Sequence, residues 1–167
     1  MTAADLARLG DEELMAVVDR KDPAAFEVLY DRHGGAAFSL AYRIVGDRTM
    51  AEDTTQEAFL SIWRSKARYD RARGSVRSWV LGVVRNRSID ALRRGGANAP
   101  KLDHDDEAAL DVREAPERTE AEAVRRETSD ELRAALQALP SEQSKVIELA
   151  YFGGFSHSEI AEIISQP

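Results

Sequence analysis

Arginine residues concentrate between Arg64 and Arg94, where ten Lys and Arg residues outnumber two acids, Asp70 and Asp90. This segment carries +8 in a chain whose formal net charge is -7, so the remainder of the chain sums to about -15. The planar guanidinium group donates two parallel hydrogen bonds and therefore suits phosphate oxygens. A basic segment in an acidic protein indicates a nucleic-acid-binding face, and a solvated Arg-rich helix face is the alternative.

Two aromatic residues and one amide lie among these arginines. Tyr69 and Trp79 could stack on unpaired bases, although a tryptophan on an apolar helix face more often belongs to a core. Asn86 can donate and accept hydrogen bonds, so it could read the edge of a base. The loop between Tyr69 and Ser75 contains two arginines and a glycine, and could border a pocket for an unstacked base.

A second group of polar residues shares one side of a predicted helix just before the arginines. Spacings of three and four residues place an apolar set on the buried side of this helix. That set comprises Ala51, Thr55, Ala58, Phe59 and Ile62. The opposite side carries Asp53, Gln56, Glu57, Leu60 and Arg64. Two carboxylates and an amide around an exposed leucine could bind another protein, but the spacing alone favours an ordinary solvent-exposed face.

Helices are the elements that must position these residues. The sequence has no sustained apolar–polar alternation and no Asn-Gly or Asp-Gly hairpin turn, so we predict an all-α fold. Helices are expected over residues 11–20, 23–45, 50–67, 75–94, 118–138, 141–151 and 157–164. Their starts are marked by Asp22 before Pro23, by Ser141, and by capping boxes at Thr49 with Glu52 and Ser156 with Glu159.

A change in composition divides the chain. From Asp103 to Glu122 there are nine acids, two bases and no aromatic residue, a composition typical of a flexible linker. We therefore predict a helical N-terminal domain over residues 1–95, an acidic linker over 96–127 and a small helical C-terminal domain over 128–167.

Several classes of function are disfavoured by what the sequence lacks. With no cysteine, there are no disulfides, thiolate zinc sites or cysteine nucleophiles. The histidines His33, His104 and His157 are scattered and are expected to be surface or helix residues, so we predict no enzyme, metal site or cofactor. No apolar run approaches a membrane span and no secretory signal is visible, which fits a soluble cytoplasmic protein without membrane contact.

The C-terminal segment has the character of a helix-turn-helix. Ser158, Glu159, Ile160 and Ala161 lie on a short predicted helix that looks like the first helix of that motif. The sequence stops at Pro167, before a second helix that would enter the major groove. We therefore expect the C-terminal domain to be truncated before its recognition helix.

Taken together, these segments resemble an extracytoplasmic-function (ECF, group IV) sigma factor of the sigma-70 family of bacterial RNA polymerase. The resemblance covers nearly the whole chain, and the segment from Gly74 to Trp79 is similar to the SigK-type branch. The other segments that carry it are Ala25–Tyr30, Ala51–Leu60, Arg85–Arg94, Ala138–Pro140 and Tyr151–Ile164.

The resemblance implies a role for each segment. A sigma2-like bundle would dock on the β′ clamp helices of the polymerase core and bind the promoter -10 element; a partial sigma4-like domain would read the -35 element near the β flap. The clamp-binding residues would be Asp53, Gln56, Glu57 and Leu60. The -10 DNA-binding residues would be Asp70, Arg71, Arg73, Ser75, Arg77, Trp79, Arg85, Asn86 and Arg87.

The resemblance also implies regulation by an anti-sigma factor that covers the same faces. Without a recognition helix, the chain itself is not expected to read a -35 element. Two other classes stay open: a helix-turn-helix regulator that binds DNA without polymerase, and a helical adaptor whose arginines contact an acidic protein.

Overall fold

The computed structural model describes residues 2–64, 68–95 and 130–165, and all regular structure within them is helical. The prediction of an all-α fold is confirmed. The chain divides into two compact units, Met1–Val112 and Arg113–Pro167. The predicted acidic linker over 96–127 lies outside the described residues. So do the first part of the helix predicted over 118–138 and the last part of the helix predicted over 50–67.

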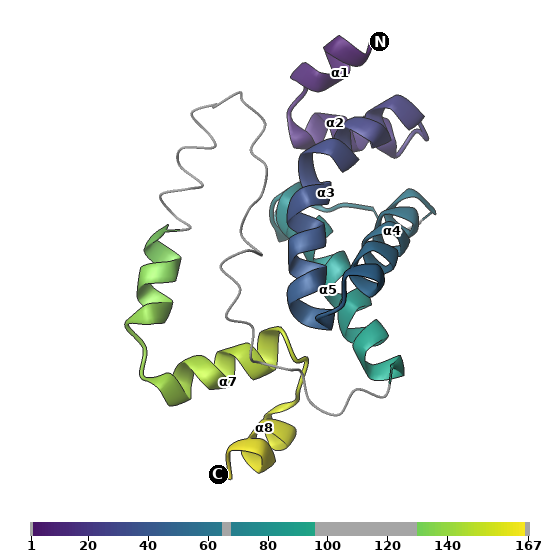
Figure 1. Cartoon of the computed structure of the whole chain (residues 1–167). Helices are drawn as coiled ribbons and strands as arrows, with labels where there is room; N and C mark the ends of the chain where they lie inside the picture. The colour runs from purple at the N-terminus through teal and green to yellow at the C-terminus, as the bar shows by residue number, and fades with distance from the viewer. Residues whose placement is uncertain (1, 65–67, 96–129, 166–167) are drawn as a thin grey trace. The chain divides into compact units, whose positions relative to one another are not determined.

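The N-terminal unit is built around one long helix. Helix α3 packs against α1, α2, α4 and α5, and α4 and α5 also pack against each other (Figure 1). The elements are α1 (Ala3–Arg8), α2 (Asp11–Val18), α3 (Pro23–Val45), α4 (Arg48–Arg64), the 3-10 helix η1 (Arg71–Arg73) and α5 (Val76–Arg94). Helix α1 was not predicted; Thr2 and Asp5 cap each other's backbone N–H groups at its start, and Leu6 anchors it in the core.

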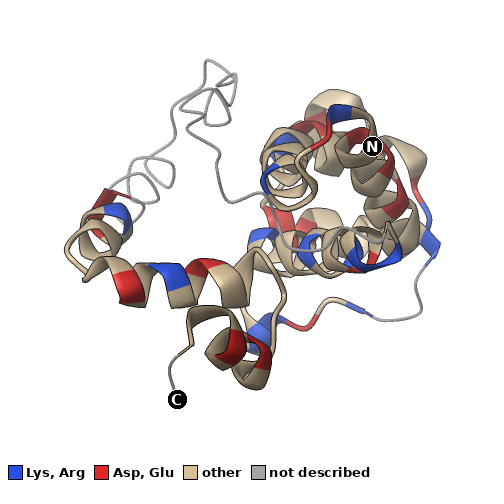
Figure 2. Ribbon diagram, turned by 60° about the horizontal axis from the view of Figure 1, so that its bottom comes forward, with Lys and Arg blue, Asp and Glu red and all other residues tan. Residues whose placement is uncertain are grey.

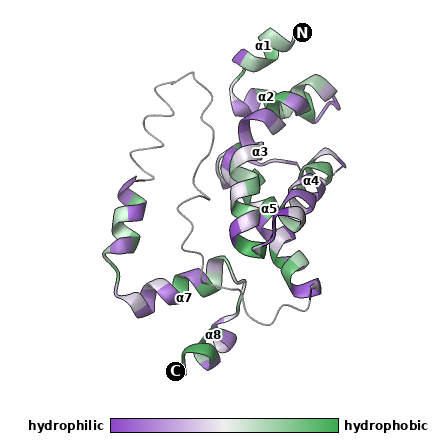
Figure 3. Ribbon diagram, in the orientation of Figure 1, coloured by the Kyte–Doolittle hydropathy of each residue, from purple (hydrophilic) through white to green (hydrophobic). Residues whose placement is uncertain are grey.

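Each helix contributes one face to the core of this unit. Apolar and polar stretches therefore follow one another along each ribbon in Figure 3. All five residues predicted on the inner side of α4 are buried, with Phe59 only 2% exposed. On α5, Val76, Val80 and Val84 are buried, whereas Trp79 and Val83 are half-buried. Because the apolar sides of α4 and α5 face the core, their polar sides face outward.

The start of α4 differs from the predicted capping box. The helix begins at Arg48, and the Asp47 carboxylate accepts a hydrogen bond of 2.8 Å from the N–H of Met50. Gly46 ends α3 in a left-handed conformation (φ 73°), so Asp47 is already free to cap the next helix. The box predicted at Thr49 is wrong, because Thr49 lies inside the first turn and Glu52 instead pairs with Arg48 at 3.0 Å.

The other predicted caps have mixed outcomes. Asp22 accepts a 3.0 Å hydrogen bond from the N–H of Ala25, and Ser156 forms its capping box with Glu159, as predicted. Ser141 does not cap, because it is already the first residue of its helix and the preceding proline occupies the cap position.

The described part of the C-terminal unit contains a helix over 130–137, followed by α7 (Ser141–Tyr151) and α8 (His157–Ile164). Leu149 and Ile160 are its buried apolar residues among those described. The turn between α7 and α8 requires Gly153, since a Cβ there would lie 2.7 Å from the Leu149 carbonyl oxygen and from the Phe155 ring. In the described part of the chain, no helix combines the length and apolarity needed to cross a membrane.

Candidate functional site

The outward face of α4 matches the predicted polar patch. Asp53, Gln56, Glu57 and Leu60 are all exposed, and Leu60 leaves 43% of its surface accessible. Because the opposite face of α4 fills the core, these side chains are presented on a rigid support. The face therefore offers an apolar centre among carboxylate and amide groups.

An open groove of about 390 Å³ lies beside this face, between α3 and α4. Its lining includes Gln56 and Thr55 from α4, and Tyr30, Gly34 and Phe38 from α3. The Tyr30 ring packs edge-on against Phe59 at 4.7 Å, and a Cβ on Gly34 would lie only 3.3 Å from that ring. Gly34 thus lets the Tyr30 ring lie close to α3, where it stays 39% exposed as one wall of the groove.

The loop before α5 is closed by its own hydrogen bonds. The Asp70 carboxylate accepts from the N–H of Ala72 at 2.9 Å, and the Tyr69 hydroxyl donates to the Gly74 carbonyl at 2.6 Å. Gly74 has φ 129°, a conformation that residues with a Cβ rarely adopt. These contacts hold the loop in one shape and leave Arg71 and Arg73 exposed.

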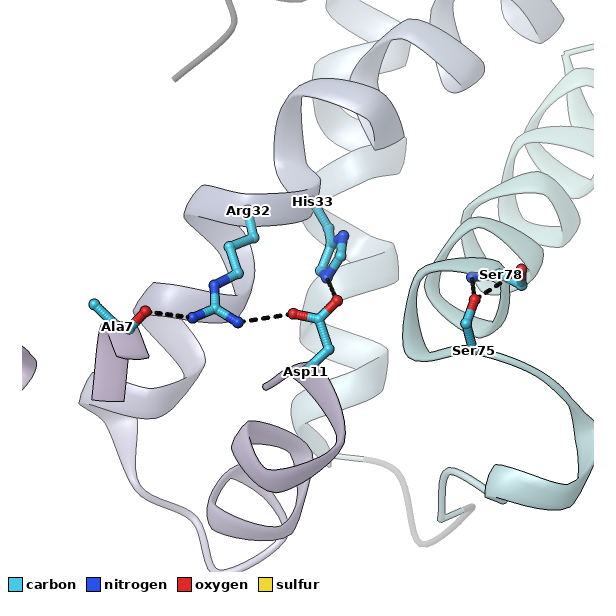
Figure 4. Close-up of polar contacts among 6 residues, drawn as sticks. All are labelled: Ala7, Asp11, Arg32, His33, Ser75 and Ser78. Carbon is cyan, nitrogen blue, oxygen red and sulfur yellow. Dashed lines mark hydrogen bonds and ion pairs between the residues drawn. The ribbon is translucent and has the colours of Figure 1, made fainter. Parts of the chain in front are cut away.

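Two residues predicted to contact DNA have structural duties in the chain. The Ser75 hydroxyl accepts from the N–H of Ser78 at 3.2 Å and donates to its Oγ at 3.0 Å, which caps α5 (Figure 4). Trp79 is half-buried and packs edge-on against the Tyr69 ring at 6.1 Å. Desolvation and the Glu12 carboxylate raise the pKa of the Tyr69 phenol.

The polar residues of α5 differ in how strongly the protein holds them. Asn86 is exposed. Arg87 is half-buried and donates a 2.9 Å hydrogen bond to the Ser61 hydroxyl of α4. Arg77 and Arg85 are half-buried and also have interaction partners in the chain. Figure 2 shows that basic and acidic residues both occur on this helical bundle.

A charged cluster that the sequence analysis missed fixes α1 and α2 on α3 (Figure 4). Asp11 lies 2.8 Å from an Arg32 nitrogen and 3.0 Å from Nε2 of His33, and Arg32 also donates to the Ala7 carbonyl at 2.7 Å. Hydrogen bonding by His33, together with Arg32, holds the pKa of the Asp11 carboxyl far below its usual range. His33 is 2% exposed and lies within α3, so of the two predicted settings, surface or helix, it occupies a helix and is buried.

The predicted helix-turn-helix residues lie on α8. Ile160 is buried, Ser158 and Glu159 are exposed, and the Glu159 carboxylate accepts from the N–H of Ser156 at 2.7 Å. Glu159 therefore helps to start α8, while Ile160 anchors it.

Comparison with known families finds one match within each of the two units. Residues 29–97 match the family described as Sigma-70 region 2, and residues 129–166 match that described as Sigma-70, region 4. The first match contains α4, the loop and α5, and the second contains α7 and α8.

Curated relatives named "ECF RNA polymerase sigma factor SigK" extend this similarity over most of the chain. The protein of Mycobacterium tuberculosis (strain H37Rv) is 30% identical over 90% of this chain and 79% of its own length. That of Mycobacterium ulcerans is 28% identical over 89% and 79%. That of Mycolicibacterium vanbaalenii is 26% identical over 90% and 76%.

Proposed function

We propose that two surfaces of this chain, a member of the ECF RNA polymerase sigma factors of the sigma-70 family, bind different partners. Members of this family act in transcription initiation with the polymerase core and promoter DNA as partners. In our proposal, the α4 face binds the core, and the loop before α5 together with α5 binds the -10 element.

The α4 face is proposed to dock on the β′ clamp helices. The single observation that carries this proposal is that Asp53, Gln56, Glu57 and Leu60 are exposed together on a helix whose other side is core. An apolar residue ringed by polar groups is a common arrangement at protein interfaces. The neighbouring groove at Gln56 could receive a side chain of the same partner.

The loop and α5 are proposed to capture one strand of the melted promoter. Arg71 and Arg73 would bind phosphates, and Asn86 would read a base edge beside the loop. Unstacking a base costs about a few kcal/mol, which contacts to the flipped base would offset. Asp70, Ser75 and Trp79 would act by holding the loop and the start of α5 in shape, which the capping and ring contacts support.

We also propose that α8 begins the helix-turn-helix that reads the -35 element, near the β flap. An anti-sigma factor would inhibit the protein by covering the α4 face and the DNA-binding loop. Both proposals follow from the family rather than from contacts in this chain.

The direct test is the affinity of the chain for polymerase core. Asp53→Ala with Gln56→Ala is expected to weaken binding about tenfold or more, since central interface residues dominate affinity. Glu27→Ala removes an exposed acid from α3, outside the proposed docking residues, and serves as the control. A wild-type chain that ignores the core but binds duplex DNA tightly would instead favour the polymerase-independent regulator.

A further inference from the structure

One arginine of the DNA-binding loop already has an anionic partner in the free protein. Nε of Arg71 lies 3.1 Å from a carboxylate oxygen of Glu12, which belongs to the first turn of α2. The Arg71 side chain is 80% exposed and that of Glu12 is 42% exposed, so solvent and a ligand can reach both. A guanidinium that holds a carboxylate presents fewer donors to a phosphate.

The Glu12 side of this ion pair is held firmly. Its neighbour Asp11 contacts Arg32 at 2.8 Å and the buried His33 at 3.0 Å. The Glu13 carboxylate accepts from the N–H of Gly10 at 3.2 Å and so fixes the start of α2. The backbone of Glu12 therefore has little freedom to move away from the loop.

The Arg71 side is held by the loop itself. Asp70 caps the 3-10 helix that contains Arg71, and Tyr69 closes the loop through Gly74 and packs on Trp79. An exposed ion pair between two ordered backbones loses less entropy than one between mobile segments.

We propose that Glu12 occupies Arg71 in place of a DNA phosphate, and that strand binding exchanges the carboxylate for the phosphate. Glu12 thereby lowers the affinity of the free chain for single-stranded DNA. This inference rests on the proposed function, in which Arg71 binds phosphate. Because phosphate contacts carry no sequence information, the exchange acts on any single strand.

The test measures binding of the full chain to fluorescent oligo(dT) of twenty nucleotides at several low salt concentrations. Glu12→Gln is expected to tighten binding about two- to fivefold, the range set by exposed ion pairs. Glu27→Gln removes the same charge from an exposed position on α3 and is the matched control. Arg71→Gln is expected to weaken binding and to reduce the salt slope by about 0.7, the value for one phosphate contact on a single strand.

A double-mutant cycle separates the exchange from general repulsion. In the Arg71→Gln background, Glu12→Gln is expected to change the affinity no more than Glu27→Gln does. Equal gains from Glu12→Gln with and without Arg71, or no gain beyond the control, overturn the inference and leave the phosphate role of Arg71 intact. If Arg71→Gln changes neither affinity nor slope, that phosphate role fails and the inference fails with it.

Discussion

The two candidate surfaces of the N-terminal unit differ in how much the protein itself uses them. On α4, Asp53, Gln56, Glu57 and Leu60 are exposed on the side of the helix away from the core. On the loop and α5, Ser75 caps a helix, Arg87 bonds to Ser61 and Arg71 pairs with Glu12. Substitutions of these four exposed α4 residues should therefore change binding alone, whereas several on the loop and α5 should change binding and stability together.

The largest expected effect comes from a substitution in the core that supports both surfaces. Phe59 lies on the buried side of α4, in ring contact with Tyr30 and Phe26. Phe59→Ala is expected to lower the free energy of unfolding by about 3–5 kcal/mol, because it leaves a cavity in the core. Denaturant unfolding followed by circular dichroism measures this loss. A cost below about 1 kcal/mol would show that Phe59 does not anchor α4 in the core.

A smaller loss of stability is expected at the charged cluster that fixes α2 on α3. Asp11→Asn should cost about 1–3 kcal/mol at pH 7, because it removes a charged acceptor from Arg32 and His33. The folded-state pKa of Asp11 lies below its unfolded value, so its stabilisation is present above about pH 4 and is lost in more acidic solution.

Urea unfolding of the wild type and Asp11→Asn at pH 7, 5 and 3 measures that pH dependence. The difference between the two proteins should be similar at pH 7 and 5 and smaller at pH 3. A difference that stays constant over the whole range would contradict the assigned role of the carboxylate.

Asn86 and Arg87, which are adjacent on α5, should differ most clearly in how substitution affects stability and DNA binding. Arg87→Ala should lower the free energy of unfolding by about 1–2 kcal/mol, since it removes the bond to Ser61, and should also weaken DNA binding. Asn86→Ala should leave stability within about 0.5 kcal/mol, because the side chain is exposed. It should instead reduce the preference for single-stranded -10 sequence over scrambled sequence by about 1–3 kcal/mol.

Thermal unfolding and fluorescence anisotropy on the two oligonucleotides measure both properties of these variants. Equal losses of Asn86→Ala on the -10 and scrambled strands would reduce Asn86 to a role without sequence selectivity.

The smallest expected effect concerns the start of α4. Asp47→Ala should cost about 1 kcal/mol because it removes the cap on Met50, whereas Thr49→Ala should cost less than about 0.5 kcal/mol. Thermal unfolding of both variants compares them directly. A larger cost at Thr49 than at Asp47 would restore the capping box predicted from sequence.

Local patterns in the sequence predicted most of the helices and both faces of α4, because three- and four-residue spacing determines which side chains share a face. They placed the start of α4 wrongly, since Asp47 and Thr49 are both good caps and the end of α3 decides between them. The contacts of His33 with Asp11 and of Arg71 with Glu12 join residues far apart in sequence, so periodicity gave no signal for them.

The roles of the site residues were predicted from the family resemblance, and the structure adds how each residue is held. Exposure on α4 agrees with a docking role, the contacts of Ser75 reveal a capping role, and those of Trp79 agree with the core alternative that its residue type favoured.

The most direct test of separable surfaces measures two affinities for each of two variants: binding to polymerase core, and binding of the assembled complex to single-stranded -10 DNA. We predict that Asp53→Ala with Gln56→Ala loses about tenfold or more in core affinity, while Asn86→Ala keeps core affinity and loses -10 selectivity. Loss of core affinity in Asn86→Ala equal to that of the α4 variant, or full core affinity in both, would contradict the account.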